Sequence, residues 1–270
     1  MQYKDTHVSN LINKITFKDV LFKGNYTLDP YQNCGFGCAY CDSAYENTIY
    51  VKTNAVELFK QEVSTIQKGR IIIGSVHDPY QPIEEKVRLT RDILEVGKEY
   101  DMPIHILTKS PLIKRDIDIL QQIHDVLVTI TIFTSDQKIS NLFEPLVPSP
   151  LDRFQMVSNL QSHHIKTGIA LIPIMPYITD GTIEDFLITS ALHHANHIIY
   201  KHLELKGDQK QMMLHLIGQI DPTLPSKYEQ LYADSYAPHD IYIAETNKHI
   251  QEICRRLRLP THHENDWEII

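Results

Sequence analysis

Short runs of apolar, mostly β-branched residues alternate with longer amphipathic segments between residues 24 and 205. The runs predict strands at 26–28, 71–75, 104–108, 126–133, 167–174 and 197–203. Most of these runs are apolar at nearly every position, which is typical of strands buried on both faces of a parallel sheet. The amphipathic segments predict helices near 55–67, 84–100, 113–124, 150–163 and 182–194.

This alternation of strand and helix predicts right-handed βαβ units and therefore an α/β fold around a parallel sheet. A partial or full barrel, with its chemistry at the carboxyl ends of the strands, is the favoured architecture. A doubly wound open sheet is the alternative, because periodicity alone does not separate the two. The alternation stops after Leu205, and prolines then punctuate helical segments such as 241–257. We expect a barrel over residues 1–205 and a helical C-terminal extension over 206–270, packed on the barrel.

Composition narrows the classes of function. The 270 residues are 42% hydrophobic and 22% charged, which is an ordinary globular composition and excludes a disordered or fibrous chain. A net charge of −8 provides no general basic field for nucleic acid, so any such contact must be local. No stretch approaches the roughly 18 apolar residues that a membrane helix needs, and the N-terminus has no apolar signal core. We therefore expect a cytoplasmic protein without membrane contact.

Three of the four cysteines fall within eight residues, at Cys34, Cys38 and Cys41, in a glycine-containing loop over residues 32–43. Thiolates on so short an irregular loop can converge on one point, which indicates metal or redox chemistry in a cytosolic protein. An iron–sulfur cluster bound by three cysteines retains one iron without a protein ligand, where a substrate or cofactor can bind. Zinc is the alternative and needs a distant fourth ligand such as Cys254 or His77.

The Cys-x3-Cys-x-Tyr-Cys spacing after a strand resembles the cluster motif of the radical S-adenosylmethionine (SAM) superfamily. Further blocks, in the same order, resemble its spore photoproduct lyase-like branch, whose members are often labelled DNA repair photolyases. These blocks are Asp29-Pro30-Tyr31, residues 74–84, Thr108-Lys109-Ser110, residues 143–145, 148–153, 173–176 and 254–257. The resemblance covers approximately residues 24–258.

The resemblance implies a partial (β/α)6 barrel in which Cys34, Cys38 and Cys41 bind a 4Fe-4S cluster whose open iron chelates SAM. It further implies a lyase-like or oxidoreductase reaction: the reduced cluster cleaves SAM, and the resulting 5′-deoxyadenosyl radical abstracts hydrogen from a substrate. A reductant such as flavodoxin or ferredoxin is the implied partner. The resemblance offers nucleic acid as a substrate class, although the net charge of −8 does not support it.

The same resemblance implies contacts to SAM. It places Tyr40 near the adenine, Ser75 at the ammonium group and Lys109 at the carboxylate. Thr129 and Thr131 alternate along the fourth strand, so their hydroxyls share one face and reach SAM if that face is the barrel interior. The alternatives are an aromatic cap over the cluster for Tyr40, turn capping for Ser75, and buried hydroxyls paired with carbonyls for the threonines.

Other positions in these blocks carry weaker expectations, and no catalytic residue is assigned. Glu144 and Arg153 belong to the resembling blocks, and a structural ion pair is the expected role of Arg153. Asp42 follows Cys41, where many members of the superfamily have an aromatic residue. Gly74 stands where spore photoproduct lyase has a cysteine that returns hydrogen to the product, so dimer repair by that route is not expected here.

Two other classes of function fit the same residues. One is a zinc- or cluster-stabilised module that binds nucleic acid or protein without catalysis. The other is an enzyme that transfers a methyl or aminocarboxypropyl group of SAM from the same pocket. Formation of 5′-deoxyadenosine distinguishes a radical enzyme from both.

Overall fold

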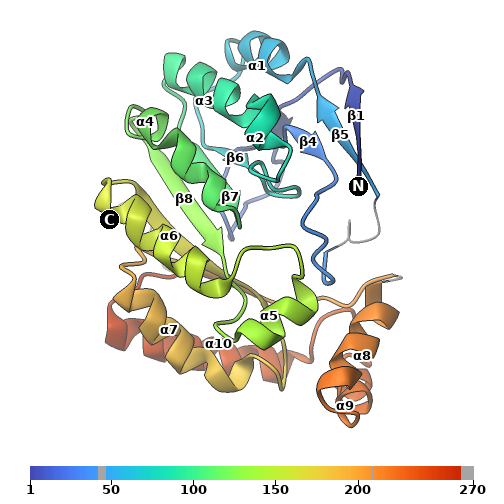
Figure 1. The fold of residues 1–270 in the computed structure, drawn as a ribbon. Helices are drawn as coiled ribbons and strands as arrows, with labels where there is room; N and C mark the ends of the chain where they lie inside the picture. The colour runs from blue at the N-terminus through green and yellow to red at the C-terminus, as the bar shows by residue number, and fades with distance from the viewer. Residues whose placement is uncertain (42–46, 208, 263–270) are drawn as a thin grey trace.

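The computed structural model describes residues 1–41, 47–207 and 209–262 (Figure 1). Its strands are β1 (Gln2–Thr6), β2 (Asn13–Lys14), β3 (Tyr26–Leu28), β4 (Tyr31–Gln32), β5 (Thr48–Lys52), β6 (Ile71–Ile73), β7 (Ile104–Thr108), β8 (Val126–Thr131), β9 (Lys166–Ile174) and β10 (Ile198–His202). Its α-helices are α1 (Ala55–Val63), α2 (Glu84–Val87), α3 (Leu89–Glu99), α4 (Ile117–Leu120), α5 (Gln137–Phe143), α6 (Pro150–Ser162), α7 (Ile183–Leu192), α8 (Gln209–Ile220), α9 (Leu224–Leu231) and α10 (Asp240–Leu257). Short 3-10 helices occupy Pro111–Asp116 and Asp180–Thr182.

The main sheet has the strand order β10-β9-β8-β7-β6-β3-β2. Every neighbouring pair in it is parallel except β2 with β3, which is antiparallel. The six parallel strands match the six predicted runs and confirm the α/β partial (β/α)6 barrel. Because parallel strands end at the same edge of a sheet, the segments that follow β3, β6, β7 and β8 gather at one mouth.

A second, three-stranded sheet with the order β1-β5-β4 was not predicted. Four of the five residues of β1 are exposed, so its sequence has none of the apolar patterning that signals a buried strand. The antiparallel pair β4–β5 encloses the cysteine loop, with Tyr31 opposite Val51 and Gln32 opposite Tyr50. The loop is therefore anchored at both of its ends by backbone pairing.

The single helix predicted over 84–100 was wrong, because Arg88 adopts a left-handed backbone with φ of 56° and separates α2 from α3. The buried carboxylate of Glu84 accepts a hydrogen bond from Thr90 N at 2.9 Å and satisfies a free amide at the start of α3. The predicted helix at 113–124 is likewise a 3-10 turn followed by the short α4. Helix α5 was not predicted.

Three helices follow β10, and α8 and α9 pack on the mouth of the barrel while α10 lies along α7 (Figure 1). The Tyr228 hydroxyl donates to the Pro176 carbonyl at 2.6 Å, and the Tyr232 hydroxyl donates to the Leu203 carbonyl at 3.0 Å. Both tyrosines belong to a hydrophobic cluster that also contains Ala39 of the cysteine loop. Helices α8 and α9 thus share one packed core with the cysteine loop.

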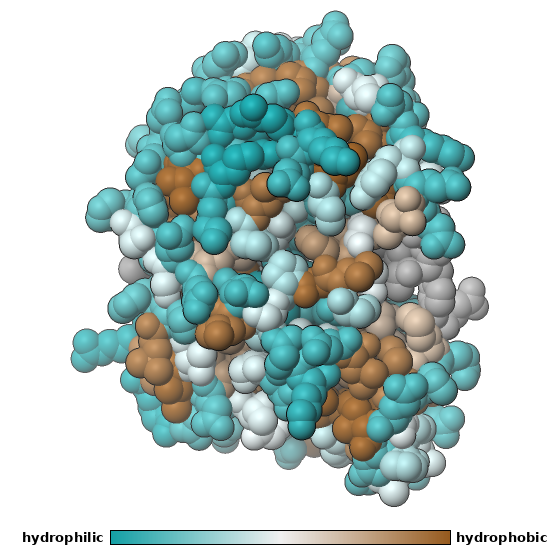
Figure 2. Space-filling model, viewed as in Figure 1, coloured by the Kyte–Doolittle hydropathy of each residue, from teal (hydrophilic) through white to brown (hydrophobic). Residues whose placement is uncertain are grey.

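Hydrophilic side chains cover most of the face in Figure 2, and hydrophobic groups form separate patches. Within the described ranges, no helix combines the length and the apolar character needed to cross a membrane.

Close packing inside the barrel predicts that a methyl group at Gly168 destabilises the protein. A Cβ atom there would lie 2.4 Å from the ring of fully buried His197. We expect Gly168→Ala to lower the free energy of unfolding by about 1–3 kcal/mol, measured by urea denaturation. Gly181→Ala is the control, because a Cβ there meets no described atom within 4 Å. Equal stability of the two variants would contradict this account of the packing.

Candidate radical SAM site

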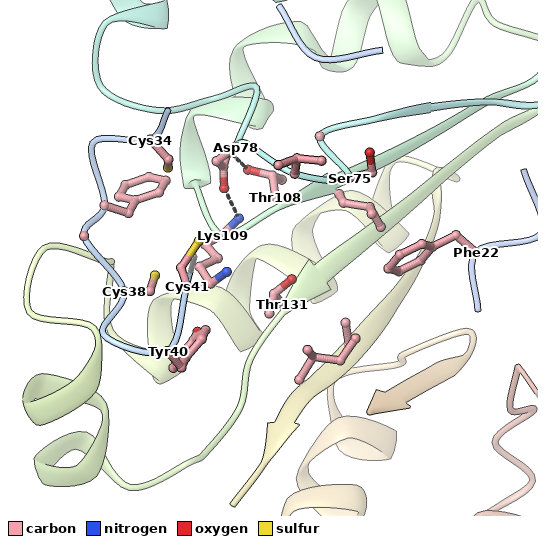
Figure 3. A pocket seen from close by; sticks show the side chains of 17 residues that line it. Phe22, Cys34, Cys38, Tyr40, Cys41, Ser75, Asp78, Thr108, Lys109 and Thr131 are labelled. Atoms are coloured by element: carbon pink, nitrogen blue, oxygen red, sulfur yellow. Dashed lines mark hydrogen bonds between the residues drawn. The ribbon is translucent and has the colours of Figure 1, made fainter. Parts of the chain in front are cut away.

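A cavity opens at the carboxyl edge of the sheet, beneath the cysteine loop (Figure 3). The loop, the segment after β6, the end of β7 and the end of β8 all contribute to its wall. Seven of the eight residues predicted for the site line this cavity: Cys34, Cys38, Tyr40, Cys41, Ser75, Lys109 and Thr131. Thr129 is not among the lining residues.

The three cysteines of the loop are not joined by disulfide bonds. Burial raises the pKa of Cys34 to about 11 and that of Cys38 to about 12. Both thiols are therefore protonated near neutral pH, and a bound cationic centre would stabilise their thiolates. Among the described side chains, no three or more His, Cys, Asp or Glu lie close enough together to hold a single metal ion.

Gln81 fixes the backbone of the loop on both sides of Cys34. Its amide oxygen accepts from Gly35 N at 3.0 Å, and its amide nitrogen donates to the Asn33 carbonyl at 3.1 Å. Gln81 is fully buried, so both bonds are shielded from water. Sequence reasoning assigned no role to Gln81, although it lies in a block that resembles the family. The sequence feature that could have indicated a role for Gln81 is its polar side chain in a turn that otherwise contains prolines.

Lys109 reaches into the cavity from the end of β7. Its Nζ lies 5.8 Å from the centroid of the Tyr40 ring, and its side chain runs beside Cys41 (Figure 3). Burial by itself would lower the pKa of Lys109, but attraction to the acidic groups around it outweighs burial and raises it. The lysine therefore remains a cation that can bind an anionic group.

Two half-buried aspartates, Asp78 and Asp29, shape the segment after β6. Asp78 accepts from the Thr108 hydroxyl and from Lys109 N, both at 2.7 Å (Figure 3). Asp29 accepts from His77 N at 3.2 Å. These bonds fasten the segment to the ends of β3 and β7. In the same segment the buried Ser75 hydroxyl has no hydrogen-bond partner among the described residues, so it is available to a ligand.

A fully buried ion pair connects the loop to the sheet. Arg153 donates to the Glu144 carboxylate at 2.6 Å and to the Thr131 carbonyl at 2.9 Å. The side chains of Arg153 and Glu144 have no exposed surface. The Tyr40 hydroxyl donates to the other carboxylate oxygen of Glu144. The structural ion pair predicted for Arg153 is therefore present. Through Glu144 this ion pair holds Tyr40, which lies between the second and third cysteines.

Thr129 lies one layer deeper in the barrel than the cavity. Its hydroxyl is 2.7 Å from His105 Nε2 and 2.8 Å from His197 Nε2, and all three side chains are fully buried. Burial lowers the pKa of His105 to about 3, so its ring is neutral at physiological pH. The alternating pattern correctly placed both threonines on one face, but depth along the strand separates Thr129 from the cavity wall.

Gly74 has a left-handed backbone with φ of 90°, and a Cβ there would lie 2.5 Å from the Leu107 carbonyl oxygen. A cysteine side chain therefore does not fit at this position without a shift of the backbone. Asp42 and Ser43 lie outside the described residues.

A model of the Radical SAM superfamily matches residues 28–188, and the chain belongs to that superfamily. An uncharacterized protein of Methanocaldococcus jannaschii is 28% identical over 215 residues, covering 76% of this chain and 78% of its own length. An uncharacterized protein of Mycobacterium tuberculosis is 23% identical over 252 residues, covering 81% of this chain and 74% of its own length. A "Radical SAM Nalpha-GlyT isomerase" of a Pseudomonas phage is 24% identical, covering 80% of this chain and 48% of its own.

Among solved structures, a spore photoproduct lyase variant with bound AdoMet and dinucleoside spore photoproduct superposes with a TM-score of 0.72 at 14% identity. The match covers 96% of this chain and 80% of that chain. SuiB of Streptococcus suis bound to S-adenosylmethionine superposes with a TM-score of 0.62 at 13% identity. This match covers 87% of this chain and 49% of the SuiB chain. These likenesses confirm the fold.

Loss of the buried cation should destabilise the protein. Arg153→Met leaves the Glu144 carboxylate buried without its counter-ion, and such changes cost about 3–5 kcal/mol of unfolding free energy. Urea denaturation measures this loss. Arg256→Met is the control, because its ion pair with Glu184 is exposed and contributes at most about 1 kcal/mol. Similar losses in the two variants would show that the buried pair has no special role.

Proposed function

We propose that Cys34, Cys38 and Cys41 bind a 4Fe-4S cluster and that the cavity beside them binds SAM. When bound, these cofactors supply a 5′-deoxyadenosyl radical that abstracts hydrogen from a substrate. The observation that carries the proposal is the placement of three cysteine thiols, a half-buried lysine and the buried Ser75 hydroxyl, which has no partner among the described residues, around one cavity. Membership of the superfamily supports it.

The donor set fits a cluster better than one zinc ion. Four ligands of a structural zinc ion surround a single point, at about 2.3 Å for each sulfur. Ligands of an iron–sulfur cluster bind separate irons and stand farther apart. The three thiols line the cavity from one loop, and three cysteine ligands would leave one iron of a cluster open to a cofactor in that cavity.

The chain's own residues then bind and orient SAM. The Lys109 ammonium is the cation for the SAM carboxylate, and the Ser75 hydroxyl is an acceptor for its ammonium group. Tyr40 forms an aromatic wall whose hydroxyl is already held by Glu144, so its ring has one fixed orientation. The apolar side chains of Leu107 and Ile172 complete the wall and exclude water from the reacting atoms.

Radical SAM enzymes need a reductant, and we propose a one-electron donor of the flavodoxin or ferredoxin type. The likeness to a spore photoproduct lyase complex supports nucleic acid as one substrate class to test. Gly74 argues against product formation through a thiol at that position, because its backbone leaves no room for a side chain.

Removal of one thiol should abolish the proposed chemistry. Cys34→Ala, reconstituted anaerobically, should lose most of its iron and sulfide and form no 5′-deoxyadenosine with dithionite and SAM. Electron paramagnetic resonance of the reduced protein, with and without SAM, measures the cluster directly. Cys254→Ala is the control, since Cys254 is buried in α10 away from the cavity. A Cys34→Ala protein with full cluster content and SAM cleavage would refute the proposal.

Lys109→Gln should weaken SAM binding while the cluster is retained. The substitution keeps a hydrogen-bond donor but removes the charge, and loss of a charge-assisted bond corresponds to an increase in Kd of about tenfold or more. The SAM-dependent change of the reduced cluster signal gives the Kd, and iron analysis verifies the cluster. Lys114→Gln, at an exposed position nearby, should bind SAM normally. Equal Kd values for both variants would exclude Lys109 as the carboxylate partner.

A further inference from the structure

A groove of about 660 Å³ lies on the outer side of the cysteine loop. Besides the loop, its wall comes from the start of α2 with the turn before it, the 3-10 helix after β7, and the connection between α5 and α6. Apolar and proline side chains supply most of this wall, among them Phe36, Pro111, Leu112, Leu146, Val147 and Pro148. The groove is thus separate from the cavity proposed for SAM.

Phe36 is the residue that the groove and that cavity have in common. It stands between Cys34 and Cys38 in the sequence, and its side chain is 4% exposed. On the other side of the loop, Ala39 packs into the hydrophobic cluster that contains residues of α8 and α9, so helices cover that side. A cluster held by the three cysteines would therefore lie one buried aromatic ring away from the groove.

The rim of the groove presents apolar surface to solvent. Leu146 is 63% exposed, and Leu112 and Val147 are half-buried. The connection that carries Leu146 is held in place, because Val147 N donates to the Glu144 carbonyl at 3.1 Å. Adjacent apolar side chains on a fixed, exposed rim are typical of a surface that contacts another protein.

The exposed ionisable side chains around the groove are mostly cations. In residues 82–88 and 110–114 they are Lys86, Arg88 and Lys114, against the single anion Glu85. None of these three cations forms an ion pair with a described residue. Residues 146–148 have no ionisable side chain. The surroundings of the groove therefore attract an acidic partner, although the chain as a whole has a net charge of −8.

We infer that this groove is the docking site of an acidic one-electron donor protein. The inference rests on the proposed function and adds the surface on which the reductant binds. The apolar rim supplies the contact, the cations steer the partner, and redox partners form small, transient complexes. In the step itself one electron leaves the donor and enters the cluster, and no bond forms or breaks. A flavodoxin hydroquinone becomes a semiquinone, or a reduced ferredoxin becomes oxidised.

The test is stopped-flow absorbance of the reconstituted protein during reduction by flavodoxin hydroquinone, by reduced ferredoxin and by dithionite. The faster of the two proteins identifies the donor type. Leu146→Glu combined with Lys114→Glu should lower its second-order rate constant at least about tenfold and flatten its dependence on salt. Reduction by dithionite should be unaffected, because a small reductant needs no docking surface. Leu192→Glu with Lys248→Glu is the control, since it makes the same change of charge on exposed residues that do not line the groove.

Equal rate constants for the two double variants would overturn the inference. Failure of both donor proteins to reduce a wild-type cluster that dithionite reduces would also overturn it. So would a wild-type dimer that Leu146→Glu dissociates in sedimentation analysis, because the groove would then bind a second copy of the chain. Isothermal titration of cluster-free protein with oxidised donor measures docking without the cluster, and the groove variant should weaken it. Formation of 5′-deoxyadenosine with dithionite and SAM is measured separately, so failure of the radical function is distinguished from failure of docking.

Discussion

The buried ion pair between Glu144 and Arg153 is the interaction on which the geometry of the site depends. Burial of two charges is unfavourable unless each is fully paired, and here the hydrogen bonds come from three separate segments. Tyr40 belongs to the cysteine loop and Thr131 ends β8, so a shift of either segment would remove a hydrogen bond from a buried charge. The loop has little regular structure of its own, and this pair substitutes for it.

The loop is also held from its other side. The antiparallel pairing of β4 with β5 fixes both of its ends, and Gln81 bonds the backbone around Cys34. Ala39 N adds a bond of 2.8 Å to the Phe143 carbonyl. These bonds hold the backbone of the cysteine loop, which reduces the ordering cost of taking up a cluster.

The cavity combines three thiols, a half-buried lysine and apolar walls, which suits the generation of a radical away from water. Tyr40 lines the same cavity, so the aromatic residue held by the buried ion pair forms part of the wall of the site.

The sequence by itself determined the strand–helix alternation, the six parallel strands and the cysteine loop, because hydrophobic periodicity and short-range spacing are local properties. It also predicted that Lys109 and Ser75 belong to one site, and both line the cavity just beyond the ends of β7 and β6, since parallel strands end at one edge. Only the tertiary structure decided the partners of buried polar groups. Thr129 pairs with two histidines rather than lining the cavity, Arg88 interrupts a helix whose apolar pattern is continuous, and β1 forms from exposed residues that pair with β5. Each of these outcomes depends on contacts between segments far apart in the chain, which no local pattern encodes.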